Sequence, residues 1–82
     1  MDINKLKEIA KKNDYEFIID ENWLDKSIIL KRKVRKDLYN FIMISLINKE
    51  HHMLYSNTAC DMRDLDMLQA AIEFTKIPIK DR

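Results

Sequence analysis

The sequence contains no glycine, although a chain of 82 residues with average composition would contain about six. Motifs that depend on glycine are therefore absent, including the phosphate-binding loop, the dinucleotide-binding fingerprint and the nucleophile elbow of hydrolases. Turn positions with a positive φ angle have to be filled by Asn or Asp instead. The sequence predicts such turns at clusters of these residues, at 13–14, 20–22 and 48–50.

Cysteine and long apolar runs are scarce as well. Cys60 is the only cysteine, which excludes an internal disulfide and is typical of proteins in a reducing cytosol. The longest nearly apolar run, 41–47, is far shorter than the roughly 20 residues of a transmembrane helix. The opening residues alternate charged and aliphatic side chains, so we expect no secretory signal. These observations predict a cytoplasmic protein without a membrane contact.

Neither sign of charge dominates. Lys and Arg number 15 against 14 Asp and Glu, so the net charge is +1, and 46% of the residues are hydrophobic. This balance is typical of one folded domain, which we expect to span residues 1–82, and argues against an acidic DNA mimic. The charge is nevertheless bipolar, with +3 on residues 1–36 and −2 on residues 37–82. A bipolar surface suits a protein partner better than a plain polyanion.

Periodicity predicts a first helix and four strands. Apolar residues at helical spacing indicate a helix over about 3–12, capped by Asp2 or Asn4 and ended by Asn13 in a left-handed conformation. Alternating and β-branched residues predict strands at 15–20, 27–35, 38–47 and 52–56. The third strand is apolar on both faces, so we place it in the centre of the sheet.

A second helix is predicted between a cap at Thr58 or Asp61 and an end near Lys76, because Pro78 disfavours helix at the residue before it. Its dipole explains the aspartates at positions 61, 64 and 66. We expect its core stripe to comprise Leu65, Leu68, Ile72 and Thr75, widened by Met67, Ala71 and Phe74.

Hairpin-length connections between the strands imply an antiparallel meander. We therefore predict a two-layer α+β fold with the element order α-β-β-β-β-α. Three or four strands would form the sheet, and both helices would pack on one of its faces.

The basic hairpin, residues 31–36 with the sequence KRKVRK, is the first candidate site. It holds five of the 15 positive charges, and on a strand Lys31, Lys33 and Arg35 would share one face. Tyr39 and Phe41 lie across the turn and would present rings beside these charges. Basic side chains interleaved with aromatic rings suit a nucleic-acid backbone with stacked bases. The alternative is a solvated hairpin, whose Lys residues discourage pairing with another sheet edge.

His51, His52, Cys60 and Asp61 are the only other residues that suggest site chemistry. Adjacent histidines on a strand point to opposite faces, and no second Cys or His stands at a zinc-ligand spacing. A lone thiol near a helix start has no supporting catalytic motif. We therefore expect no metal, no cofactor and no enzymatic activity.

Two apolar features are open to a structural or a functional interpretation. Trp23 lies in a predicted turn, and the second helix has a wide Met67–Phe74 flank. Both could belong to the core. Both could instead anchor a protein partner or a homodimer through the second helix.

Two segments resemble phage proteins. The stretch Leu68–Arg82 is similar to the ends of small phage and prophage proteins of low-GC Gram-positive bacteria, with matches at Ala71, Glu73, Phe74, Pro78, Ile79 and Arg82. The opening MDINKLKEIAKKNDYEF resembles that of a small phage inhibitor of an RNA-guided Cas nuclease, offset by one residue. That inhibitor is an acidic DNA mimic, whereas this chain has a net charge of +1. The resemblance implies a phage anti-defence protein of the anti-CRISPR kind and transfers no functional residue.

These observations predict a non-enzymatic, phage-encoded inhibitor in the cytoplasm of an infected or lysogenic host. It would bind a bacterial defence protein or ribonucleoprotein complex, such as a CRISPR-Cas nuclease, and block it sterically. The expected contact residues are Lys31, Lys33, Arg35, Lys36 and Tyr39, with Trp23 as a further contact. The alternative is a small nucleic-acid-binding phage regulator that uses the basic hairpin.

Overall fold

The computed structural model describes residues 1–21, 26–47 and 61–82, together with the backbone of residues 52–55. Trp23, His51, Thr58 and Cys60, which figured in the sequence-based predictions, lie outside this part. The elements in chain order are α1 (Ile3–Lys12), β1 (Glu16–Glu21), β2 (Lys26–Arg35), β3 (Leu38–Ser45), β4 (His52–Tyr55), α2 (Met62–Thr75) and the short 3-10 helix η1 (Ile79–Asp81). The predicted α+β class, with an antiparallel sheet and two helices, is confirmed. The predicted element boundaries agree with the observed ones to within two residues.

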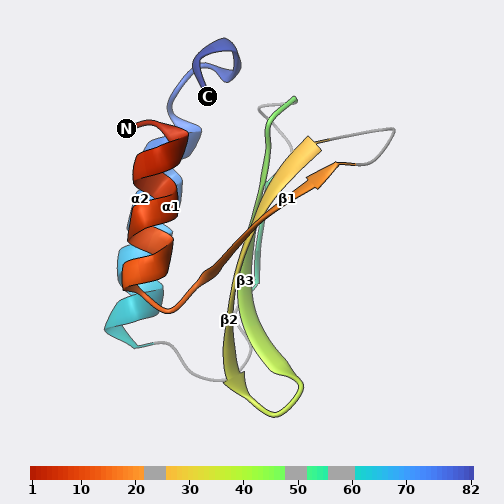
Figure 1. Ribbon diagram of the computed structural model, residues 1–82, viewed down its shortest axis with the longest axis vertical. Helices are drawn as coiled ribbons and strands as arrows, with labels where there is room; N and C mark the ends of the chain where they lie inside the picture. The colour runs from red at the N-terminus through yellow and green to blue at the C-terminus, as the bar shows by residue number, and fades with distance from the viewer. Residues whose placement is uncertain (22–25, 48–51, 56–60) are drawn as a thin grey trace.

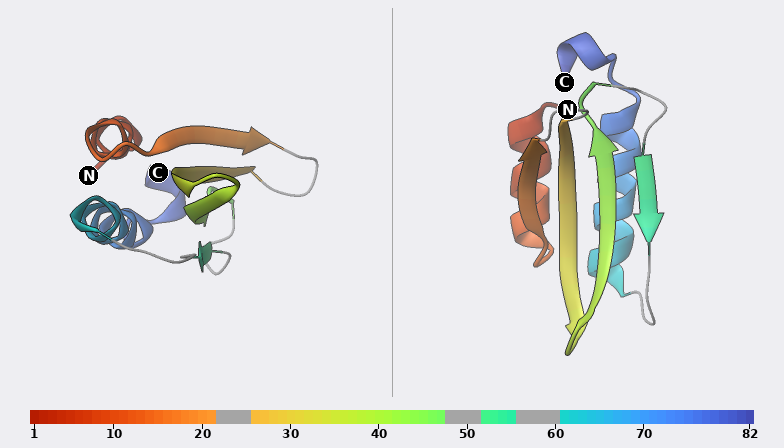
Figure 2. Two further views of the ribbon diagram at one scale, coloured as in Figure 1. Left: turned by 90° about the horizontal axis from the view of Figure 1, so that it is seen from below. Right: turned by 90° about the vertical axis from the view of Figure 1, so that its right-hand side faces the viewer.

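The strands form an antiparallel sheet in the order β1-β2-β3-β4, so β1 and β4 are its edges. Leu30 in β2 lies opposite Phe17 in β1 and Ile42 in β3, which fixes the register across the sheet. Both helices lie on the same face of the sheet (Figure 1). Seen from the other face, α1 lies behind β1 and α2 lies behind β3 and β4 (Figure 2).

The core fills the space between the sheet and the two helices. It is built from one stripe of each helix and from the inward-facing residues of β2 and β3; its buried members are Leu6, Ala10, Tyr15, Ile28, Leu30, Ile42, Ile44, Met67, Ala70, Ala71 and Phe74. Burying a large aliphatic or aromatic side chain contributes about 1.5–3 kcal/mol each. This single apolar layer therefore supplies most of the free energy that holds the helices on the sheet.

The predicted core stripe of α2 was wrong in part. Met67, Ala71 and Phe74 are buried as predicted, but Leu65 and Ile72 are 52% and 48% exposed. The other two buried residues of α2 are Ala70 and the charged Asp64. Since neighbouring helix positions differ by about 100°, facing position 64 inward instead of position 65 turns Leu65 and Ile72 to solvent. The reason for this rotation is the buried partner of Asp64, described below.

Asp residues fill the two positive-φ positions among the described residues. Asp14 follows α1 with φ 61° and Asp37 lies in the β2–β3 turn with φ 62°. Asp14 confirms the predicted cluster at 13–14, whereas the left-handed conformation predicted for Asn13 was wrong, because its φ is −105°. The Asn13 side chain instead donates to the carbonyl of Ile9 at 2.9 Å. Asp37 was not predicted as a positive-φ position.

Arg82 ties the end of α2 to the end of β3. Its guanidinium donates to the carbonyl oxygens of Ile77, Ser45 and Thr75, at 2.9, 3.0 and 2.5 Å. The same group lies 5.9 Å from the centre of the Phe74 ring. Three carbonyls near a helix end that would otherwise need water are thereby satisfied by one side chain.

The Asp37 turn can be tested with two substitutions. An L-residue pays a steric penalty in the left-handed region, which glycine avoids and a β-branched residue increases. We expect Asp37→Gly to raise the free energy of unfolding by up to about 1 kcal/mol and Asp37→Val to lower it by about 1–2 kcal/mol. Urea denaturation of the purified variants measures both. Equal stabilities for the two variants would contradict the assignment of this turn.

Candidate interaction surface

Among the residues that the structure describes, no helix lies on one of the two faces of the sheet. In antiparallel strands, paired residues point to the same side. The buried row Ile28–Ile44 and the row Leu30–Ile42 face the helices. The alternating rows therefore face away from them, and Figure 2 shows this side of the sheet with both helices behind it. We call this side the outer face. Its described residues include Glu16, Ile18, Asp20, Ile29, Lys31, Lys33, Tyr39, Phe41 and Met43, together with Ser27 and Ser45, which are buried at the end far from the hairpin.

The outer face is apolar in its centre. Ile18, Ile29 and Met43 form one row across β1, β2 and β3, and Phe41 lies in the next row. All four side chains are partly exposed. No helix or strand in the described part of the chain lies over them. A sheet with one helical layer leaves such a face available for another molecule.

The basic hairpin extends from one end of the outer face. Lys31 lies 3.9 Å from the Glu16 carboxylate and its ammonium is 5.2 Å from the centre of the Tyr39 ring. Lys33 is paired with Tyr39 across the hairpin. The predicted grouping of these two lysines with Tyr39 is therefore present in the structure.

Arg35 departs from the prediction that it shares a face with Lys31 and Lys33. The register shifts between Lys33 and Arg35, so that Arg35 is paired with Leu38. Such a bulge adds a residue to one strand and changes the side to which the following side chains point. Lys33, Arg35 and Lys36 are exposed, and none of them forms an ion pair with a residue that the structure describes.

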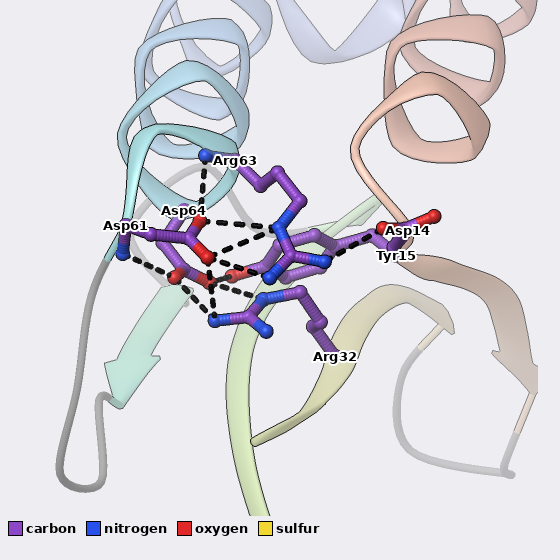
Figure 3. A network of polar contacts seen from close by, with 6 residues as sticks. All are labelled: Asp14, Tyr15, Arg32, Asp61, Arg63 and Asp64. Carbon is purple, nitrogen blue, oxygen red and sulfur yellow. Dashed lines mark hydrogen bonds and ion pairs between the residues drawn. The ribbon is translucent and has the colours of Figure 1, made fainter.

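Arg32, the buried residue of the basic hairpin, was not identified from the sequence as a structural residue. Its guanidinium forms a bidentate pair with Asp64 of α2, with Nε–Oδ1 and Nη2–Oδ2 distances of 2.9 and 2.6 Å (Figure 3). The side chains are only 9% and 5% exposed. The burial of Arg32 could have been predicted from the period-two pattern of β2, which places it on the same side as Ile28 and Leu30.

Both oxygens of the Asp64 carboxylate accept further hydrogen bonds besides those from Arg32. The Tyr15 hydroxyl donates to Oδ1 at 2.6 Å, and the backbone N–H of Asp61 donates to Oδ2 at 2.9 Å. The latter bond is half of a capping box, whose other half is the Asp61 side chain at the start of α2. No buried side-chain polar atom among the described residues lacks a hydrogen-bond partner. Asp61, one of the two caps predicted for α2, is thus its N-cap.

Burial and hydrogen bonding act on Asp64 in opposite directions. Burial raises the pKa of the Asp64 carboxyl, but the hydrogen bonds that it accepts, first of all from Arg32, lower that pKa well below the ordinary value of 3.8. The same hydrogen bond raises the pKa of Arg32. Both groups therefore stay charged throughout the neutral range. A carboxylate without a proton to give is a structural group, not a general acid.

Arg63 extends the network to the surface. Its guanidinium lies 2.6 Å from the Asp61 carboxylate and 2.7 Å from that of Asp14, in the turn after α1 (Figure 3). The hydrogen bond from Arg63 holds the pKa of Asp61 below its usual range. Exposed pairs of this kind contribute little to stability. Their effect is to join the α1–β1 turn to the start of α2.

Of the other predicted candidates, His51, Cys60 and the side chain of His52 lie outside the described residues, and Asp61 is the N-cap of α2. Within these residues, no three His, Cys, Asp or Glu side chains lie together as metal ligands would. A shallow groove of about 370 Å³ between α1 and α2 has Lys12, Asp66 and Glu73 among its lining residues, but no nucleophile beside a base. None of the described helices has the length and apolar character needed to cross a bilayer.

The buried ion pair predicts a large effect of a small substitution. Asp64→Asn removes the bidentate partner of the buried Arg32 guanidinium and leaves it only the half-exposed Asp61 carboxylate at 3.9 Å. Breaking a buried pair in this way typically costs about 3–5 kcal/mol. We expect the free energy of unfolding, measured by urea denaturation, to fall by that amount. Asp66→Asn, an exposed residue of the same helix, is the matched control and should change it by less than about 0.5 kcal/mol. Similar losses in the two variants would show that the pair is not buried.

The lowered pKa of Asp64 also predicts the response to acid. Because this pKa is lower in the folded than in the unfolded chain, its stabilising effect is present above the ordinary value of 3.8 and is lost as the pH falls. We expect the free energy of unfolding to drop between about pH 5 and pH 2. Tyr15→Phe removes one donor, so an NMR titration of the Asp64 carboxyl should show a higher pKa than in the wild type. An unchanged pKa would contradict the contact with Tyr15.

Comparison of the chain with protein-family models, with curated proteins and with solved structures gives no match in any of the three.

Proposed function

We propose that the chain is a non-enzymatic binding protein that covers an acidic protein surface with its outer face and basic hairpin. The observation that carries this proposal is the outer face itself, an apolar centre over which no described helix lies, bordered by the exposed cations Lys33, Arg35 and Lys36, which form no ion pair with a described residue. An apolar centre with a charged rim is the usual anatomy of a protein–protein interface. The cations at the hairpin end would orient the partner and speed its association.

The distribution of charge favours a protein over a nucleic acid as the partner. Carboxylates are interspersed with the basic residues on the outer face: Glu16 of β1 is paired with Lys31 and lies 3.9 Å from its ammonium, and Asp20 lies further along the same strand. A phosphate backbone that followed the sheet would meet these carboxylates. The row formed by Ile18, Ile29 and Met43 offers no ring for base stacking, and the rings of Tyr39 and Phe41 lie in other rows, paired with Lys33 and Lys31.

The identity of the partner follows from the resemblance of the terminal segments to phage proteins. On that ground we propose a defence protein or ribonucleoprotein complex of a low-GC Gram-positive host, such as a CRISPR-Cas nuclease, blocked by steric occlusion. The contact residues proposed here are Lys31, Lys33, Arg35, Lys36 and Tyr39. Because no reactive group is needed for occlusion, inhibition would scale with occupancy of the target.

Affinity capture from a lysate of such a host, treated with nuclease, tests the proposed surface. We expect Lys33→Glu and Met43→Glu each to reduce the captured partner at least tenfold, since one reverses a rim charge and the other puts a charge in the apolar centre. Lys80→Glu, an exposed charge reversal in η1, is the control and should capture as much as the wild type. Circular dichroism confirms that each variant is folded. Equal capture by all four proteins would disprove the role of the outer face.

Direct nucleic-acid binding is the second candidate function, favoured by the contact of Lys31 with Tyr39 and by the exposed cations Lys33, Arg35 and Lys36 near it. Labelled single-stranded DNA and RNA oligonucleotides test it. Binding through the hairpin should be strong at about 50 mM salt and fall steeply by about 200 mM. The protein-partner proposal predicts no measurable binding of either polymer at the lower salt concentration.

A further inference from the structure

We infer that the solvent-facing side of α2 binds a second copy of this chain in an antiparallel, two-fold arrangement. The exposed apolar residues Met62, Leu65 and Ile72 are 66%, 52% and 48% exposed and lie along one line of the helix. At about 100° per residue, this line is opposite the stripe that faces the core. This inference is independent of what the outer face binds. We call this line the α2 ridge.

The ridge is complementary to itself when two copies run antiparallel. The midpoint of α2 lies between Leu68 and Gln69. A two-fold axis at that point places Leu65 opposite Ile72 of the second copy, so that the two exposed aliphatic residues of each copy meet. Met62 then lies opposite Thr75. A parallel arrangement would instead place identical residues side by side.

Charge supports the same arrangement. The axis that pairs Leu65 with Ile72 also places Asp61, at the start of α2, opposite Lys76, at its end. Lys76 is exposed and forms no ion pair with a described residue. The antiparallel orientation also brings the positive end of each helix dipole beside the negative end of the other. Apolar contacts, side-chain charges and dipoles therefore all select one orientation.

The size of the ridge sets the expected affinity. The helix is about 21 Å long, and a few half-exposed side chains bury much less than the roughly 800 Å² per partner of a standard interface. We expect a dissociation constant between about 10 μM and 1 mM. In the dimer the two outer faces would lie on opposite sides, because each ridge lies opposite its own sheet. The dimer would therefore present two binding faces to a partner with repeated sites.

Sedimentation velocity over about 10 μM to 1 mM protein tests the self-association. We expect the wild type to shift from monomer to dimer over this range and Leu65→Glu to remain monomeric, because it puts a charge opposite Ile72. Ile47→Glu changes an equally apolar residue, 58% exposed, that lies outside the ridge, and should dimerise like the wild type. A wild type that is monomeric throughout would overturn the inference and leave the ridge to a different partner. Equal effects of Leu65→Glu and Ile47→Glu on dimerisation would also overturn the inference.

Cross-linking tests the orientation and does not depend on a destabilising variant. In a Cys60→Ser background, Gln69→Cys places the new thiols next to the two-fold axis, within reach of a disulfide between copies. Met62→Cys places them about 20 Å apart along the helices. We expect oxidation to cross-link the first variant at least tenfold faster than the second. Equal rates would rule out the antiparallel arrangement.

Discussion

The buried pair of Arg32 and Asp64 is the constraint on which the arrangement of this fold depends. A charged residue can lie at the interface between sheet and helix only if its partner is there too, with the remaining lone pairs occupied. Tyr15 and the backbone of Asp61 occupy them. The network therefore joins the start of β1, the middle of β2 and the first turn of α2 at one point. Apolar burial alone would hold α2 on the sheet without fixing its rotation.

Both candidate surfaces follow from that rotation. Because Asp64 faces inward, Leu65 and Ile72 face solvent and the outward side of α2 is more apolar than its sequence pattern predicts. Because α1 and α2 both lie on the side of the sheet that Arg32 faces, neither of them covers the other side (Figure 2). A single polar contact in the interior thus determines which apolar groups the protein presents outside.

The sequence predicted what depends on local pattern. The class, the element order and the boundaries follow from periodicity, and the cap at Asp61 follows from the preference of aspartate for helix starts. The core stripe of α2 could not be predicted from residue type, because hydrophobicity alone assigns leucine and isoleucine to the core and aspartate to solvent. Which side of α2 faces the core depends on Arg32, which lies 32 positions before Asp64 in the chain. Likewise, the bulge that separates Arg35 from Lys33 depends on the geometry of the turn at Asp37, which carries no glycine to mark it.

The position of β1 at the edge of the sheet has a consequence for solubility at high concentration. An open strand edge invites backbone pairing with another copy, which is a common start of aggregation. If two copies of β1 paired antiparallel about its centre, Glu16 would lie opposite Glu21, and like charges directly opposed in a ladder are unfavourable. The acidic ends of this strand therefore disfavour sheet extension between copies.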